Sequence, residues 1–131
     1  MRLIQKVVFC AAHRLMETDT VCKYVHGHNY KVWFTVSGTN KDGMVIDFFD
    51  LEELCKAAVS AWDHGIMLRN DDPLVNIMTG VDQKVYVFVK NPTCETMVEE
   101  LPKLLKLPKD VVLESIRLKE MDQYEVEKSF V

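Results

Sequence analysis

Residues 26–37 read HGHNYKVWFTVS, and this stretch joins a clear strand pattern to two histidines at its start. Every second residue from Tyr30 to Val36 is apolar, while Lys31 and Thr35 lie at alternate positions. Alternation of this kind predicts a β-strand with one face buried. In an extended segment the histidines at 26 and 28 share a face, with Cα atoms about 6.6 Å apart at roughly 3.3 Å per residue.

The segments on both sides of this strand predict an α+β fold. Apolar spacing predicts two helices, one starting after an Asp47 N-cap and one starting near residues 91–93, with Pro102 expected to kink or split the second. The order is β-β-α-β-α-β-β, which is typical of an antiparallel sheet with helices on one face. Residues 71–90 are interpreted as an insertion with an extra strand. The expected strands are 2–12, 29–37, 84–89, 111–121 and 124–130.

The histidines predict a metal site. If residues 2–13 and 26–37 pair as antiparallel neighbours, His13 lies beside His26 and His28. Three neutral imidazoles with a fourth position open are the ligand set of catalytic zinc, and we therefore expect Zn²⁺ here. The alternative is a pair of surface histidines together with one core histidine.

Two further groups have side chains suited to proton transfer. Cys22 lies on the loop before His26, where a metal and Lys23 would favour its thiolate as base or nucleophile. It could instead be a fourth zinc ligand or a plain loop residue. Asp63 and His64 follow the first helix, where the carboxylate can orient the imidazole. The alternative for His64 is a solvated helix end favoured by the dipole.

Length and charge limit the class of protein. With 131 residues, one domain spanning 1–131 is expected. A net charge of −4 argues against nonspecific binding to nucleic acid or to an anionic membrane. The four cysteines have no CxxC spacing, and no signal peptide or membrane-spanning run is evident, so a cytoplasmic protein with reduced thiols is expected.

Several sequence blocks, in order, resemble the 6-pyruvoyl-tetrahydropterin synthase / 6-carboxy-tetrahydropterin synthase family. The resemblance covers nearly the whole chain and rests on several independent blocks. They are Phe9-x-Ala11-Ala12-His13-Arg14-Leu15, Cys22, His26-Gly27-His28-Asn29-Tyr30, Gly43-Met44-Val45-Ile46-Asp47-Phe48, Asp63-His64, Asn91-Pro92-Thr93-x-Glu95 and Glu120.

This resemblance implies a T-fold, a sheet with two helices on one face, that assembles through its strands into homo-oligomers. It implies a trimer or a homohexamer with active sites between subunits. It implies a zinc-dependent lyase whose small-molecule substrate is a pterin triphosphate. The implied site residues are His13, His26 and His28 for zinc, Cys22, Asp63 and His64 for catalysis, and Glu120, Thr93 and Glu95 for the substrate.

Within the family, three residues between the cysteine and His-Gly-His favour the carboxy branch. That branch converts 7,8-dihydroneopterin triphosphate to 6-carboxy-tetrahydropterin, a precursor of queuosine, and releases acetaldehyde and triphosphate. Alternatives are the pyruvoyl branch, a pterin side-chain aldolase, and a noncatalytic zinc-stabilised binding module closed by Cys22. Charge and proximity make Arg14, Lys23 and Lys31 candidates for triphosphate binding. Departures from the family pattern include Cys10, Trp62 and Met121.

Overall fold

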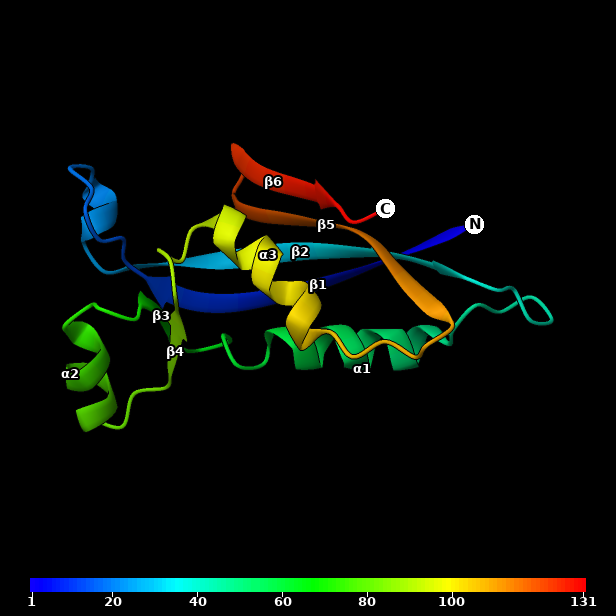
Figure 1. The fold of residues 1–131 in the computed structure, drawn as a ribbon, viewed down its shortest axis with the longest axis horizontal. Helices are drawn as coiled ribbons and strands as arrows, with labels where there is room; N and C mark the ends of the chain where they lie inside the picture. The colour runs from blue at the N-terminus through cyan, green and yellow to red at the C-terminus, as the bar shows by residue number, and fades with distance from the viewer.

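The computed structural model describes residues 1–131 as one six-stranded sheet with three α-helices. The elements are β1 (Arg2–His13), η1 (Val21–Lys23), β2 (His26–Gly38), α1 (Phe48–Val59), β3 (Ile66–Arg69), α2 (Leu74–Gly80), β4 (Val85–Phe88), α3 (Cys94–Leu104), β5 (Val111–Met121) and β6 (Tyr124–Ser129). The strand order in the sheet is β4-β3-β1-β2-β5-β6 (Figure 1). No helix combines the length and the apolar character needed to cross a membrane.

The long central hairpin of β1 and β2 confirms the predicted pairing. The two strands run antiparallel from Arg2 opposite Ser37 to His13 opposite His26. Because side chains alternate across a strand, the odd residues of β1 and the even residues of β2 face the same side. This register brings the histidines of both strands to one end of the sheet.

Helices α1 and α3 cover the buried face of this hairpin. Phe9 stacks on Tyr30 with ring centroids 5.0 Å apart, and Trp62 packs against Phe9. The apolar side of α1 and that of α3 join the same core. The expected cap of α1 forms, with Asp47 accepting from the Phe49 N–H at 2.7 Å. The core therefore ends where the histidines begin.

Several predictions for the second half of the chain are wrong in detail. The sheet is mixed, because β3 pairs parallel with both β1 and β4, and the sequence analysis did not find β3. The segment 71–90 contains the expected strand, β4, and also the unpredicted helix α2, which Figure 1 shows at one end of the molecule. Short strands and short helices carry too few residues for periodicity to separate them.

One local expectation also changes, and one irregularity interrupts β5. Helix α3 is not split by Pro102, because the proline lies in its last turn and the helix ends at Leu104. A β-bulge shifts the pairing of β5 with β2, so Val112 is exposed and Val111 is buried. A bulge reverses which side alternate residues face. Ile116 and Leu118, beyond the bulge, are buried.

Candidate metal centre and active site

Three imidazoles converge where β1 ends and β2 begins. His13 and His26 place their Nε2 atoms 3.1 Å apart. One ring nitrogen from each of His13, His26 and His28 lies within 4.8 Å of the other two. The register predicted from the sequence is therefore sufficient to assemble these three side chains.

Backbone carbonyls orient two of the three rings. His13 donates from Nδ1 to the Pro92 carbonyl at 2.8 Å, and His26 donates from Nδ1 to the Tyr24 carbonyl at 2.7 Å. A proton on Nδ1 leaves the Nε2 lone pair free, and such supporting bonds are the usual second shell of a metal site. Both lone pairs are thereby directed into the cluster.

Burial favours the neutral form of His13 and His28. The pKa of His13 is lowered from 6.5 to about 4, chiefly by burial and also by the neighbouring His26 and His28. The pKa of His28 is also lowered, chiefly by burial. Neutral imidazole is the form that binds metal, so His13 and His28 need not lose a proton near pH 7 to do so.

The cluster fits a metal ion by a further observation. Nε2 of His28 is buried and has no hydrogen-bond partner. A buried polar atom without a partner costs free energy, and a cation at the centre of the triad would satisfy it. His13, His26 and His28 are the residues that would hold the ion.

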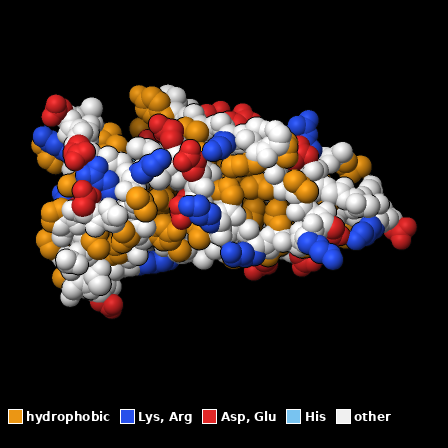
Figure 2. All heavy atoms as spheres, in the orientation of Figure 1, with side chains coloured by type: hydrophobic (Ala, Val, Ile, Leu, Met, Phe, Trp, Pro, Cys, Tyr) orange, Lys and Arg blue, Asp and Glu red, His pale blue; other side chains and the backbone are white.

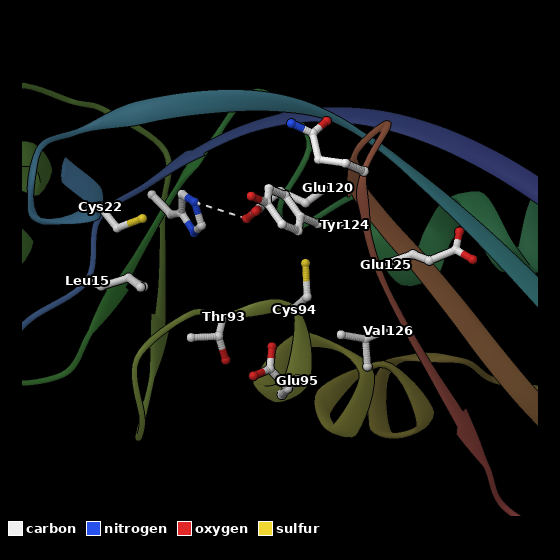
Figure 3. A pocket seen from close by; sticks show the side chains of 11 residues that line it. Leu15, Cys22, Thr93, Cys94, Glu95, Glu120, Tyr124, Glu125 and Val126 are labelled. Atoms are coloured by element: carbon white, nitrogen blue, oxygen red, sulfur yellow. Dashed lines mark ion pairs between the residues drawn. The ribbon is translucent and has the colours of Figure 1, made fainter. Parts of the chain in front are cut away.

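A pocket of about 500 Å³ opens beside the triad (Figure 3). It is formed by the end of β1, the loop before β2, the start of α3 and the β5–β6 hairpin. Figure 3 shows Cys22 and Glu120 on opposite sides of the view, with Cys94 pointing in from the start of α3 below Glu120. Its lining residues are His13, Leu15, Cys22, Thr93, Cys94, Glu95, Glu120, Gln123, Tyr124, Glu125 and Val126.

Cys22 is held in the pocket wall by a short 3-10 turn. Thr20 caps this turn by accepting from the Cys22 N–H at 3.3 Å. The Cys22 carbonyl accepts from the Leu15 N–H at 2.9 Å, which ties the turn to the segment after β1. The neighbouring Lys23 ammonium lies over the Tyr24 ring, 5.3 Å from its centroid. The thiol is therefore positioned by backbone contacts.

Hydrogen bonds hold the segment Asn91-Pro92-Thr93 in place beside the site. Asn91 accepts from the Met16 N–H and donates to the Met16 carbonyl, each at 2.8 Å. Thr93 caps α3 by accepting from the Thr96 N–H at 3.2 Å. Thr93 thus has a structural bond as well as a place in the pocket lining, whereas Asn91 fixes the segment that leads to Cys22.

Two carboxylates expected to bind substrate are in the pocket. Glu95 lies in the first turn of α3, and Glu120 lies on β5 beside the triad. Glu120 Oε1 is 3.5 Å from Nε2 of His13 and 3.5 Å from Nε2 of His28. The pKa of the Cys94 thiol is raised to about 12, chiefly by burial and also by Glu120, so this second thiol stays protonated at neutral pH.

Asp63 and His64 contact each other as expected, but they do not line the pocket that contains Cys22. His64 Nδ1 is 3.0 Å from Asp63 Oδ1, and Asp63 accepts from the Cys10 N–H at 3.0 Å. That backbone bond is the chief reason why the pKa of Asp63 is lowered. His64 has a positive φ of 61°, an uncommon backbone conformation for a residue with a side chain. Its side chain is 81% exposed.

The sheet separates this pair from Cys22. His64 lines a hollow of about 350 Å³ together with Cys10, Ala12 and Gly27. These residues alternate with His13 and His28, so they face the other side of the hairpin. One chain therefore does not bring His64 to Cys22.

An ion pair that the sequence pattern does not predict holds the loop after β1. Arg14 donates to Asp72 through Nε at 2.8 Å and also through a terminal nitrogen, and the Asp72 side chain is fully buried. Arg14, a triphosphate candidate, is thus engaged in structure. Lys31, another candidate, lies opposite Val8 on the side of the sheet away from the triad. A polar residue in a short loop gives no periodic signal of burial.

A family profile described as 6-pyruvoyl tetrahydropterin synthase matches residues 2–129 of the chain. A protein of Rickettsia conorii named 6-carboxy-5,6,7,8-tetrahydropterin synthase is 31% identical over 132 residues, covering 97% of this chain and 95% of the relative. A Rickettsia bellii protein with the same name is 34% identical over 115 residues, covering 80% of this chain and 83% of the relative.

Solved structures share the fold. An uncharacterized protein of Wolinella succinogenes superposes with a TM-score of 0.82 at 19% identity, covering 100% of this chain and 98% of the other. The 6-pyruvoyl tetrahydropterin synthase of Caenorhabditis elegans superposes with a TM-score of 0.71 at 21% identity, covering 100% and 96%. At these identities the likeness establishes the T-fold, as expected from the sequence.

Proposed function

The chain belongs to the 6-pyruvoyl tetrahydropterin synthase family, and from this premise we propose that it is a 6-carboxy-5,6,7,8-tetrahydropterin synthase. Its substrate would be 7,8-dihydroneopterin triphosphate, and its products 6-carboxy-tetrahydropterin, acetaldehyde and triphosphate. The observation that carries the proposal is one pocket lined by His13 of the triad, the Cys22 thiol and the Glu120 carboxylate. The names of the near full-length relatives favour the carboxy product.

Each half of the pocket would bind one part of the substrate. Glu120 and the start of α3 would hold the pterin ring, whose 2-amino and ring N–H groups are paired donors that suit a carboxylate. The side chain of the substrate would then lie between the triad and Cys22. We propose zinc as the metal, which would act as a Lewis acid on the side-chain oxygens when bound.

The protein groups would move the protons. Cys22 would remove a proton from the substrate side chain as thiolate. His64, oriented by Asp63 at 3.0 Å, would relay protons as general acid and base. Because the sheet separates His64 from Cys22 in one chain, we propose that a neighbouring subunit supplies the Asp63–His64 pair.

The surface is compatible with such an assembly. The sheet is open, with β4 at one edge and β6 at the other, so both edges offer unpaired backbone groups. Large apolar side chains remain exposed near β4 and at the start of α1, including Val89 at 81% and Phe49 at 82%. Figure 2 shows apolar side chains gathered between charged ones on one face. Edge-to-edge pairing of copies would close the sheet into a barrel.

Incubation of the zinc-loaded protein with 7,8-dihydroneopterin triphosphate under reducing conditions tests the activity. Mass spectrometry should identify 6-carboxy-tetrahydropterin, together with acetaldehyde. A product retaining all three side-chain carbons would assign the pyruvoyl branch, and hydroxymethyl-dihydropterin would assign an aldolase. Unchanged substrate with tightly bound zinc would refute the catalytic proposal in favour of a binding module.

A further inference from the structure

Glu120 lies against the metal centre itself. Its Oε1 atom is 3.5 Å from Nε2 of His13 and equally far from Nε2 of His28. The side chain is 22% exposed and lies in the wall of the pocket (Figure 3). Among the acidic side chains that line this pocket, Glu120 is the one paired with triad nitrogens. It therefore faces the edge of the triad formed by His13 and His28.

We infer that Glu120 is a fourth ligand of the metal in the substrate-free protein. Tetrahedral zinc binds nitrogen and oxygen at about 2.0–2.1 Å, which places neighbouring ligand atoms about 3.3–3.4 Å apart. The distance between His13 Nε2 and His26 Nε2 is 3.1 Å, and the two distances to Glu120 Oε1 are 3.5 Å. These three spacings are close to the edges of such a tetrahedron, and they place Glu120 on the His13–His28 side of the triad, away from His26.

Charge favours the same assignment. Three neutral imidazoles leave the two positive charges of the ion uncompensated, and a charge in a buried setting needs a partner. The Glu120 carboxylate supplies one negative charge at the correct place. Cys22, the other candidate for a fourth ligand, lines the same pocket, whereas Glu120 has a side-chain oxygen 3.5 Å from two of the imidazole nitrogens. These two contacts favour the carboxylate.

The consequence is that one side chain has two successive roles, and this step rests on the proposed function. Without substrate, the Glu120 carboxylate occupies the fourth position. When the substrate's side-chain oxygens take that position, the carboxylate is released to accept from the N–H donors of the ring. Binding of the substrate would then change the ligands of the metal and the partner of Glu120 together. A ligand lacking side-chain oxygens would not release Glu120.

Cobalt substitution and zinc titration of the full-length protein test the ligation. In E120Q and E120A, zinc affinity should fall by about 100-fold or more, since changes to merely supporting residues cost roughly 10–100-fold. The visible bands of the Co²⁺ protein should shift in position and intensity, because water would replace the carboxylate in the ligand set. E125Q is the matched control, because Glu125 lines the same pocket but contacts no triad nitrogen, and its affinity and spectrum should stay those of the unmodified protein.

Unchanged zinc affinity and an unchanged cobalt spectrum in folded E120Q and E120A would overturn the inference. If both variants fail to fold, a structure of the zinc-loaded unmodified protein decides the matter. Glu120 oxygen at about 2.0–2.2 Å from zinc is expected, and water in its place overturns the inference. These readouts need no turnover, so a protein that passes them but converts no pterin would refute the proposed function alone.

Discussion

The two sides of the β1–β2 hairpin differ in how far a single chain prepares them for chemistry. On the side covered by helices, His13 is buried and its ring is oriented by a backbone carbonyl. On the other side, His64 is 81% exposed beside Asp63. Burial protects the neutral state that a metal ligand needs, whereas a proton relay must reach its substrate. The chain alone gathers three imidazoles that could hold a metal ion, whereas it leaves Asp63 and His64 on the other side of the sheet from Cys22.

The largest effect is expected from removal of a triad imidazole. His28→Ala should reduce zinc binding by more than the roughly 100-fold that supporting residues cost, because a direct ligand is lost. Competition with a chromophoric chelator measures the affinity. Asn29→Ala is the control, since Asn29 is exposed on the opposite face. Equal zinc affinity in the two variants would show that the triad is not the metal site.

Next in size is the loss of the Cys22 thiol. Cys22→Ala should retain zinc and its stability but lower kcat by about 10²–10⁴-fold, the range for a positioned acid or base. Zinc content and steady-state kinetics are measured on one preparation. Loss of zinc together with lower stability would instead make Cys22 a ligand of a closed structural site.

Mixing of variants tests whether Cys22 and His64 of one active site come from different subunits. Cys22→Ala and His64→Ala should each be nearly inactive as pure oligomers. Co-expressed in equal amounts, they should recover about a quarter of the wild-type activity, because random neighbours create intact sites between subunits. Co-expression of tagged and untagged Cys22→Ala chains is the control. Mixed oligomers as inactive as that control would mean that Cys22, Asp63 and His64 of one active site come from the same chain.

The smallest effect concerns the support of the metal side. Asp72→Asn should lower the free energy of unfolding by about 3 kcal/mol near pH 7, because Arg14 loses its buried partner. The Arg14 hydrogen bond holds the pKa of Asp72 below its usual 3.8. The contribution is therefore complete above about pH 5 and is lost as the pH falls through the lowered pKa.

Urea unfolding at pH 7 and near pH 3 measures this pH dependence. The difference between wild type and Asp72→Asn should shrink at the lower pH. Asp71→Asn is the matched control, because Asp71 pairs with Arg69 but its side chain is 59% exposed, and such pairs contribute at most about 1 kcal/mol. A pH-independent difference would mean that the ion pair is not the source of the stability.

Much of the metal side could be predicted from the sequence because it depends on local rules. Alternation in β2 fixed which residues face the core, and the antiparallel hairpin placed His13 opposite His26. The Asp47 and Thr93 caps follow from side chains that bond the next turn of their own helix. Strand β3 was missed because its four residues, all apolar except Arg69, show no alternation.

The central hairpin, the cluster of three histidines and the contact between Asp63 and His64 follow from the sequence alone. Only the tertiary structure decided that His64 and Cys22 lie on opposite sides of the sheet, that Arg14 is bound to Asp72, and that Glu120 reaches the imidazoles. The two groups of outcomes differ in how far apart along the chain the interacting residues lie. Periodicity and capping act over a few residues, whereas these three outcomes depend on which strands become neighbours and on where a bulge turns a side chain.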